Sequence, residues 1–169
     1  MPAFIIQTFT ASYDPYEDRV RLAVVNEQGD AQTIWLTRRL LDRLLAALVK
    51  SVEEQNPAGV PLEVAQTMQQ EQMRQARQLA GEPKPVTPTE GAPGWLCTTV
   101  HLNKLEDGIT LIMTDNHNTE ATLQLSAVNL RAVLDVLLTV YRAAEWGLAV
   151  FPAWMKAEVQ PDVRCARLN

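Results

Sequence analysis

Few residues in this chain have the type and spacing that chemistry requires. His101 and His117 are its only histidines, and only His117 has a nearby carboxylate in the sequence, at Asp115. A metal site needs several such ligands converging on one point. The run 115–118, Asp-Asn-His-Asn, is instead typical of a turn, because Asn and Asp tolerate left-handed backbone conformations. The pattern therefore favours a hairpin loop over a metal site.

Nucleophiles and phosphate loops are equally poorly supported. No serine lies in a Gly-x-Ser-x-Gly elbow, and Ser126 is explained as a helix cap because it directly precedes an apolar helical run. With only 7 glycines in the chain, no glycine-rich phosphate loop is present. Five carboxylates of the first half lie in predicted turns, where water solvates them: Asp14, Glu17, Asp18, Glu27 and Asp30. We expect a protein without catalytic activity and without a cofactor or metal.

The charge balance argues against duplex nucleic acid as a ligand. Lys and Arg number 15 against 20 Asp and Glu, which gives a formal charge of -5, whereas duplex binders usually carry a basic patch. One local exception is the pair Arg19 and Arg21, which alternate with apolar residues and so face solvent from a predicted strand. This pair could contact single-stranded nucleic acid on an open sheet face, although the sequence interleaves no stacking aromatics with it.

The sequence is typical of a cytoplasmic protein. Cys97 and Cys165 lie far apart and form no disulfide framework. The amino terminus has no secretory signal pattern, and the apolar runs are shorter than the ~20 residues that a membrane span needs. We therefore expect a cytoplasmic location and no membrane partner.

The pattern of one stretch occurs twice. A shift of 89 positions, from Thr37 to Ser126, places Val20–Leu48 on Ile109–Leu137 without a gap. In both copies the apolar period changes at the same place, from every second residue to every third or fourth. The identities are few, but this shared change of period indicates a duplicated strand, strand and helix unit.

A further strand precedes each unit, and a turn joins that strand to the unit. We predict strands over 4–11, 19–25 and 32–36 in the first copy, and over 95–102, 109–114 and 120–125 in the second, since apolar and polar residues alternate there. The fold class is therefore α+β: a duplicated antiparallel three-stranded meander plus helix, in the order βββα-α-βββα. The strands should form a sandwich or half-barrel with the helices packed against it.

Three helices follow from the remaining periodicity. Residues 38–54 form a leucine-rich amphipathic helix capped by Thr37, and residues 127–146 form a second helix that ends at Gly147. Between them, residues 62–80 carry six glutamines and a broken apolar line. We expect this glutamine-rich helix to bury little and to be partly exposed, mobile or docked on another molecule.

The chain is expected to be one domain, 1–169, of two repeats. The first repeat spans 1–56, and the glutamine-rich helix and proline-rich linker follow over 57–94. The second repeat spans 95–147, and a tail covers 148–169.

The end of the second helix and the tail bring large aromatic residues together. Trp146, Phe151 and Trp154 lie within nine positions. The tail either folds back over the core, which we favour, or offers these aromatics to a partner. The apolar surface of the second helix also covers more than one face, which suggests contacts from two sides.

The order of elements resembles a known superfamily. Strands, a two-helix insertion over 38–80, further strands and a last helix from Ala127 are similar to the head domains of the DNA end-joining scaffold and centriole-assembly proteins. The strings Gly108-Ile109-Thr110-Leu111, Thr114-Asp115-Asn116-His117 and Glu120-Ala121-Thr122 also resemble the central hairpin of those heads. The resemblance covers about 4–146 and implies a dimerising, non-enzymatic head that recruits other proteins. The last helix has no sustained heptads, so the resemblance does not extend to the coiled-coil stalk.

The sequence thus predicts a non-catalytic protein-interaction module that forms a homodimer and possesses no cofactor. Candidate partner contacts are Trp146, Phe151 and Trp154. The alternative is a single-stranded nucleic-acid binder that uses Arg19 and Arg21, a function that the similar meander-and-helix order of whirly-like nucleic-acid-binding repeats also suggests.

Overall fold

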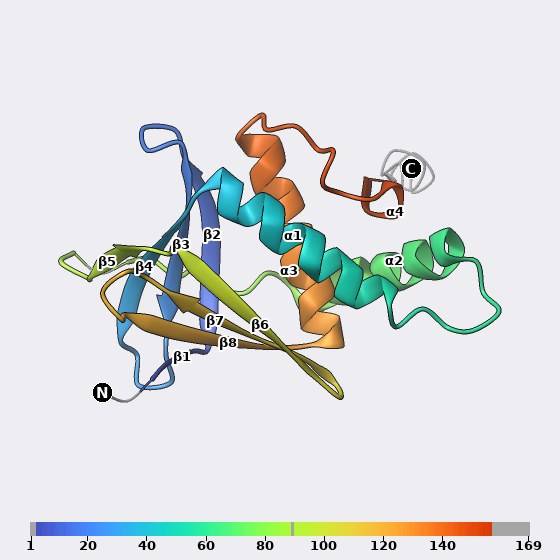
Figure 1. Cartoon of the computed structure of the whole chain (residues 1–169), viewed down its shortest axis with the longest axis horizontal. Helices are drawn as coiled ribbons and strands as arrows, with labels where there is room; N and C mark the ends of the chain where they lie inside the picture. The colour runs from blue at the N-terminus through green and yellow to red at the C-terminus, as the bar shows by residue number, and fades with distance from the viewer. Residues whose placement is uncertain (1–2, 89, 157–169) are drawn as a thin grey trace, which may run out of the picture.

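A computed structural model describes residues 3–88 and 90–156 of the chain (Figure 1). Within these residues, two four-stranded sheets and four helices make an α+β fold, as predicted. The sheet orders are β1-β8-β7-β6 and β2-β3-β4-β5, called sheet A and sheet B below. The strands are β1 (Phe4–Ile6), β2 (Thr8–Asp14), β3 (Arg19–Val25), β4 (Ala31–Leu36), β5 (Gly94–Leu96), β6 (Thr99–Leu105), β7 (Gly108–Thr114) and β8 (Glu120–Ser126). The helices are α1 (Arg38–Glu53), α2 (Leu62–Ala80), α3 (Ala127–Ala143) and α4 (Ala153–Lys156).

The two meanders pair in equivalent registers. In sheet B, β3 and β4 are antiparallel with Val20 opposite Leu36. In sheet A, β7 and β8 are antiparallel with Ile109 opposite Leu125, which are the same two positions shifted by 89. The inward-facing apolar side chains of both pairs are buried, because alternation places every second residue on the core face.

The first strand of each half differs from the prediction. The strand expected over 4–11 divides into β1 and β2, and the one expected over 95–102 divides into β5 and β6. Each short first piece leaves its own meander: β1 pairs in parallel with β8, and β5 pairs in parallel with β4. As a result, each half contributes one short strand to the sheet of the other half.

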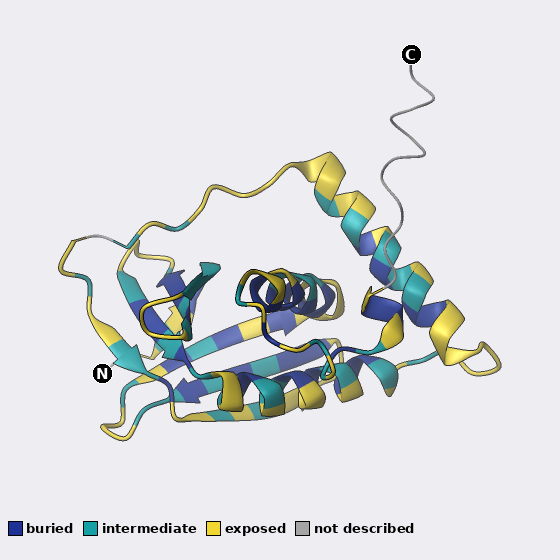
Figure 2. Cartoon of the chain, turned by 90° about the horizontal axis from the view of Figure 1, so that it is seen from above, coloured by how far each residue is buried: buried dark blue, intermediate teal, exposed yellow. Residues whose placement is uncertain are grey.

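The core lies between the inner faces of the two sheets and the helices α1 and α3. Thr37 and Ser126 cap these helices through their side-chain oxygens, as their positions in the sequence predict. Helix α3 is the central helix and contacts β2, β7, β8, α1 and α2, which confirms the expectation of contacts from more than one side. Figure 2 shows it end-on, with α1 on one side and the linker and α2 on the other.

Two helix predictions need correction. Helix α3 ends at Ala143 rather than near Trp146, because Glu145 adopts a left-handed conformation with φ of 54° that a helix cannot continue through. The glutamine-rich helix α2 is docked within the chain on α3 and α4, and its Gln66 and Gln70 are fully buried. The prediction that this helix buries little rested on its broken apolar line. Buried glutamine side chains are polar, so they do not show in such a pattern.

Gly108 allows β7 to approach β8 closely. A Cβ atom at this position would lie 2.1 Å from the Leu125 carbonyl oxygen. We expect Gly108→Ala to lower the free energy of unfolding by about 2–4 kcal/mol, since backbone atoms would have to move. Gly147→Ala is the matched control, because the nearest atom that its methyl group meets is the end of the Arg38 side chain, 3.9 Å away. Urea denaturation measures both; equal midpoints would contradict the prediction.

Candidate self-association surface

The outer face of sheet A is an open surface with almost no charge. The register places the outward side chains of β1, β6, β7 and β8 side by side on it. They are Ile5, Thr99, His101, Asn103, Leu105, Thr110, Ile112, Thr114, Glu120, Thr122 and Gln124, all exposed or half-buried. Ile5 is 52% exposed and Leu105 is 55% exposed. Glu120, at one end of β8, is the only carboxylate among them, and no Lys or Arg is present.

The alternation of the strands produces this face. Along β8 the buried residues Ala121, Leu123 and Leu125 point to the core, so that the intervening threonine and glutamine point outward. On β6 the one lysine, Lys104, points to the inner side and forms an ion pair with Glu54 next to α1. The cation is thus removed from the outer face, which stays neutral.

The outer face of sheet B is different in chemistry. It carries Arg19 and Arg21 of β3, both half-buried, and Arg19 forms an ion pair with Glu17 at 3.9 Å. Directly across from Arg21 on β4 lies Trp35, also half-buried. Sequence reasoning missed this arginine and tryptophan pair, because the two residues are neighbours only through the hairpin register.

The proline-rich linker crosses part of that second face. The backbone N–H of Val86 donates a 2.8 Å hydrogen bond to Thr10 Oγ1, an outward residue of β2. Ala23 and Thr33, on the same face, are buried. Figure 2 shows the linker running from α2 back to sheet B on the side away from α1. The face is therefore only partly open, contrary to the expectation for a single-strand binding platform.

The three aromatic residues expected to contact a partner lie inside the chain. Trp146, Phe151 and Trp154 are 8%, 2% and 1% exposed. The tail folds back as far as α4, and Tyr141 packs edge-on against both Trp146 and Phe151 with ring centroids 5.1 Å apart. The assignment of these side chains to a partner surface is therefore corrected: their apolar area covers the core of the chain itself.

The two indole nitrogens are also satisfied within the chain. Trp154 Nε1 donates to Glu53 Oε1 at 2.9 Å, and Trp146 Nε1 donates to Asp18 Oδ1 at 3.3 Å. A buried indole N–H needs such a partner. Residues 157–169 of the predicted tail lie outside the described residues.

The histidines do not converge. His101 is exposed on the outer face of sheet A, and His117 lies in the β7–β8 turn, where the structure has a hairpin as predicted. Burial acts to raise the pKa of the Asp115 carboxyl, but hydrogen bonds from the backbone N–H groups of Thr119 and His117 hold it below its usual value. The Asp115 carboxylate thus accepts hydrogen bonds within the turn. Within residues 3–88 and 90–156, no group of three potential metal ligands comes together.

A shallow concavity of about 550 Å³ lies beside this turn. Gln32, Trp95 and Thr98 line it together with residues 115–117. The indole N–H of Trp95 is already bonded to Gln32 Oε1 at 3.0 Å. Cys97, which precedes Thr98 in the chain, is buried, and burial raises the pKa of its thiol to about 11. A thiol with that pKa is protonated at neutral pH and is a poor nucleophile.

The comparisons with known proteins add no relative. No family model, no curated protein and no solved structure matches this chain. The resemblance to the end-joining and centriole-assembly head domains therefore stays a prediction. None of the helices described here is long and apolar enough to cross a membrane.

The fold-back of the tail is tested by truncation. Ending the chain after Gly147 removes the buried side chains of Phe151, Trp154 and Met155. Loss of one buried aromatic typically costs about 3–5 kcal/mol, so this chain should be unfolded. Ending the chain after Lys156 is the control, since it removes only residues outside the described range. Circular dichroism melts compare the two; a cooperative, folded truncation at Gly147 would refute the packing role.

The thiol chemistry of Cys97 gives a second test. In a Cys165→Ser background, where Cys97 is the remaining cysteine, a thiol reagent at pH 8 should react far more slowly than with the unfolded chain. The reason is that a pKa of about 11 leaves the thiol protonated at pH 8, and burial blocks access. The rate is read from the absorbance of released thionitrobenzoate. Labelling at the rate of a free thiol would contradict the prediction.

Proposed function

We propose that the protein is a non-catalytic interaction module that associates with a second copy of itself through the outer face of sheet A. The observation that carries this proposal is the near absence of charge on that face, in a chain of which 21% of the residues are charged. Exposed Ile5 and Leu105 and half-buried Ile112 add apolar area among the threonines. An open sheet face of this kind can pack against another sheet.

The chemistry of the face favours a second copy over other partners. Two neutral faces can stack without opposing like charges. A nucleic-acid ligand would need cations to neutralise phosphates, and this face has none among its described residues. The proposal keeps the predicted homodimer and moves its contact surface from the tail aromatics to sheet A.

Two further expectations belong to the same proposal. The equal registers of the two meanders, 89 positions apart, support an internal duplication. The turn hydrogen bonds of Asp115 and the separation of the two histidines support a role without catalysis. The free thiol of Cys97 is compatible with the expected cytoplasmic location.

Sedimentation equilibrium tests the dimer. We expect the wild-type chain to dimerise, and the double variant Thr122→Lys with Gln124→Lys to weaken association at least about tenfold, because two cations per copy would be desolvated and opposed. The control is Gln72→Lys, at an exposed glutamine on α2. Circular dichroism confirms that each variant is folded. A monomeric wild type, or a double variant that dimerises equally well, would overturn the proposal.

A second candidate function rests on the pair Arg21 and Trp35. An arginine beside a half-exposed tryptophan can hold a phosphate and stack a base. If single-stranded nucleic acid binds here, a labelled oligonucleotide should bind the wild type with a strong salt dependence. The variant Trp35→Ala should lose about 1–3 kcal/mol of that binding. Fluorescence anisotropy measures this; absence of binding at low salt would exclude the function.

A further inference from the structure

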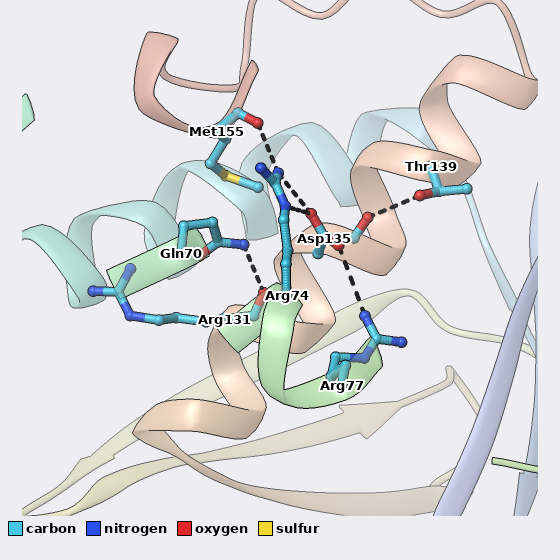
Figure 3. A network of polar contacts seen from close by, with 7 residues as sticks. All are labelled: Gln70, Arg74, Arg77, Arg131, Asp135, Thr139 and Met155. Carbon is cyan, nitrogen blue, oxygen red and sulfur yellow. Dashed lines mark hydrogen bonds and ion pairs between the residues drawn. The ribbon is translucent and has the colours of Figure 1, made fainter. Parts of the chain in front are cut away.

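Helix α2 is attached to the rest of the chain mainly by polar side chains. Gln66 Oε1 accepts a 2.6 Å hydrogen bond from Arg131 Nη2 on α3, and Gln69 Oε1 accepts from the same nitrogen. Gln70 Nε2 donates to the Arg131 carbonyl oxygen at 3.2 Å (Figure 3). Three of the six glutamines of this helix therefore contact the same residue, Arg131.

Arg131 is a buried cation without a matching anion among the residues that the structure describes. Its side chain is 8% exposed, and its guanidinium carbon lies 5.8 Å from the ring centre of Trp154. Within the described part of the chain, no carboxylate pairs with it, and its Nη1 has no hydrogen-bond partner. Gln70 Oε1, on α2, is buried and equally without a partner there. Unpaired buried polar atoms cost free energy, so this contact is poorly matched.

A second group of contacts lies one turn further along α2. Arg74 donates to Asp135 Oδ1 and to the Met155 carbonyl oxygen, at 2.8 and 2.9 Å, and Arg77 lies 3.7 Å from the same carboxylate. Figure 3 shows both arginines converging on Asp135. These ion pairs are partly exposed, and such pairs typically contribute only about 0–1 kcal/mol each.

Apolar burial adds little to the attachment of α2. Ala65 and Met73 are its only buried apolar side chains, whereas α1 buries Leu41, Leu45, Leu48 and Val52. Both ends of α2 lead into non-helical connectors, residues 54–61 on one side and 81–88 on the other. Elements with few buried apolar contacts open at lower free energy than the core.

We infer that α2 is a releasable cover, and that the groove it leaves on α3 and α4 binds an amphipathic helix that carries a carboxylate opposite Arg131. Release of α2 exposes the Arg131 guanidinium and the part of α4 that α2 contacts, including the Met155 carbonyl oxygen that Arg74 binds. A carboxylate offers two charged acceptor oxygens to a guanidinium, where the glutamines offer only neutral ones. The partner helix would therefore satisfy a cation that α2 leaves unpaired. This inference is independent of self-association through sheet A.

The groove chemistry favours a helix over a phosphate ligand. Met155 and Trp154 are apolar and are 1% exposed with α2 in place. Asp135, on the same side of α3, would repel phosphates and pairs well with basic residues of a helix, as Arg74 shows. A mixed apolar, acidic and basic helix face complements all of these groups.

Hydrogen exchange tests the release of α2. In the full chain, the amides of 62–80 should exchange together and at least about tenfold faster than those of α1 and α3. Gln69→Glu should slow that exchange by about tenfold, since it supplies the missing carboxylate. Gln72→Glu, on the exposed side of α2, is the matched control and should change nothing. If α2 exchanges only with global unfolding, or if both variants behave alike, the inference is wrong.

A peptide experiment tests the partner chemistry. The probe is a fluorescent peptide of residues 62–80 carrying Gln69→Glu, compared with the unsubstituted peptide by anisotropy on the full chain. The acidic peptide should bind about tenfold more tightly, and Arg131→Met in the protein should abolish the difference. Equal binding of the two peptides, no binding of either, or displacement of the acidic peptide by a single-stranded oligonucleotide would each overturn the assignment.

Discussion

The exchange of short strands between the two halves is the constraint on which the rest of the structure depends. Strand β1 pairs with β8, and β5 pairs with β4, both in parallel. Each sheet thus contains a strand from the other half of the sequence, so neither half can complete its sheet alone. The exchange brings the inner faces of both sheets onto the same helices, and α3 becomes a central helix with contacts on most sides.

Burial in this protein is apolar at the centre and polar at the rim. Around Tyr141 the core is made of edge-on aromatic contacts, and its hydroxyl donates to Asp42 Oδ1 at 2.7 Å. Under α2, by contrast, a buried arginine is surrounded by glutamine amides. Burying a guanidinium group away from water costs free energy. Hydrogen bonds to neutral amide oxygens offset this cost less well than a carboxylate would. The two regions should therefore differ in stability, with α2 the weaker one.

The outer faces of the two sheets differ in charge. Sheet B carries Arg19, Arg21 and Trp35 and is partly covered by the linker. Sheet A carries neutral residues because its one lysine in β6 points inward to Glu54. Two sheets of similar topology thus differ in the charge of their outer faces, and the proposed self-association rests on that difference.

The sequence alone determined the elements that local periodicity encodes, and the tertiary structure decided how they are connected. Alternation in β3, β4, β7 and β8 and the leucine stripe of α1 report burial directly, so these elements and the α+β class were predictable. The candidate face on sheet A follows from the same alternation but was not singled out, since only the register shows that its strands place uncharged residues together. The favoured fold-back of the tail anticipated the burial of Trp154, whereas the strand exchange and the docking of α2 on Arg131 were not predictable. Each depends on contacts between residues distant in sequence, and a polar contact such as that of Gln66 leaves no apolar pattern to read.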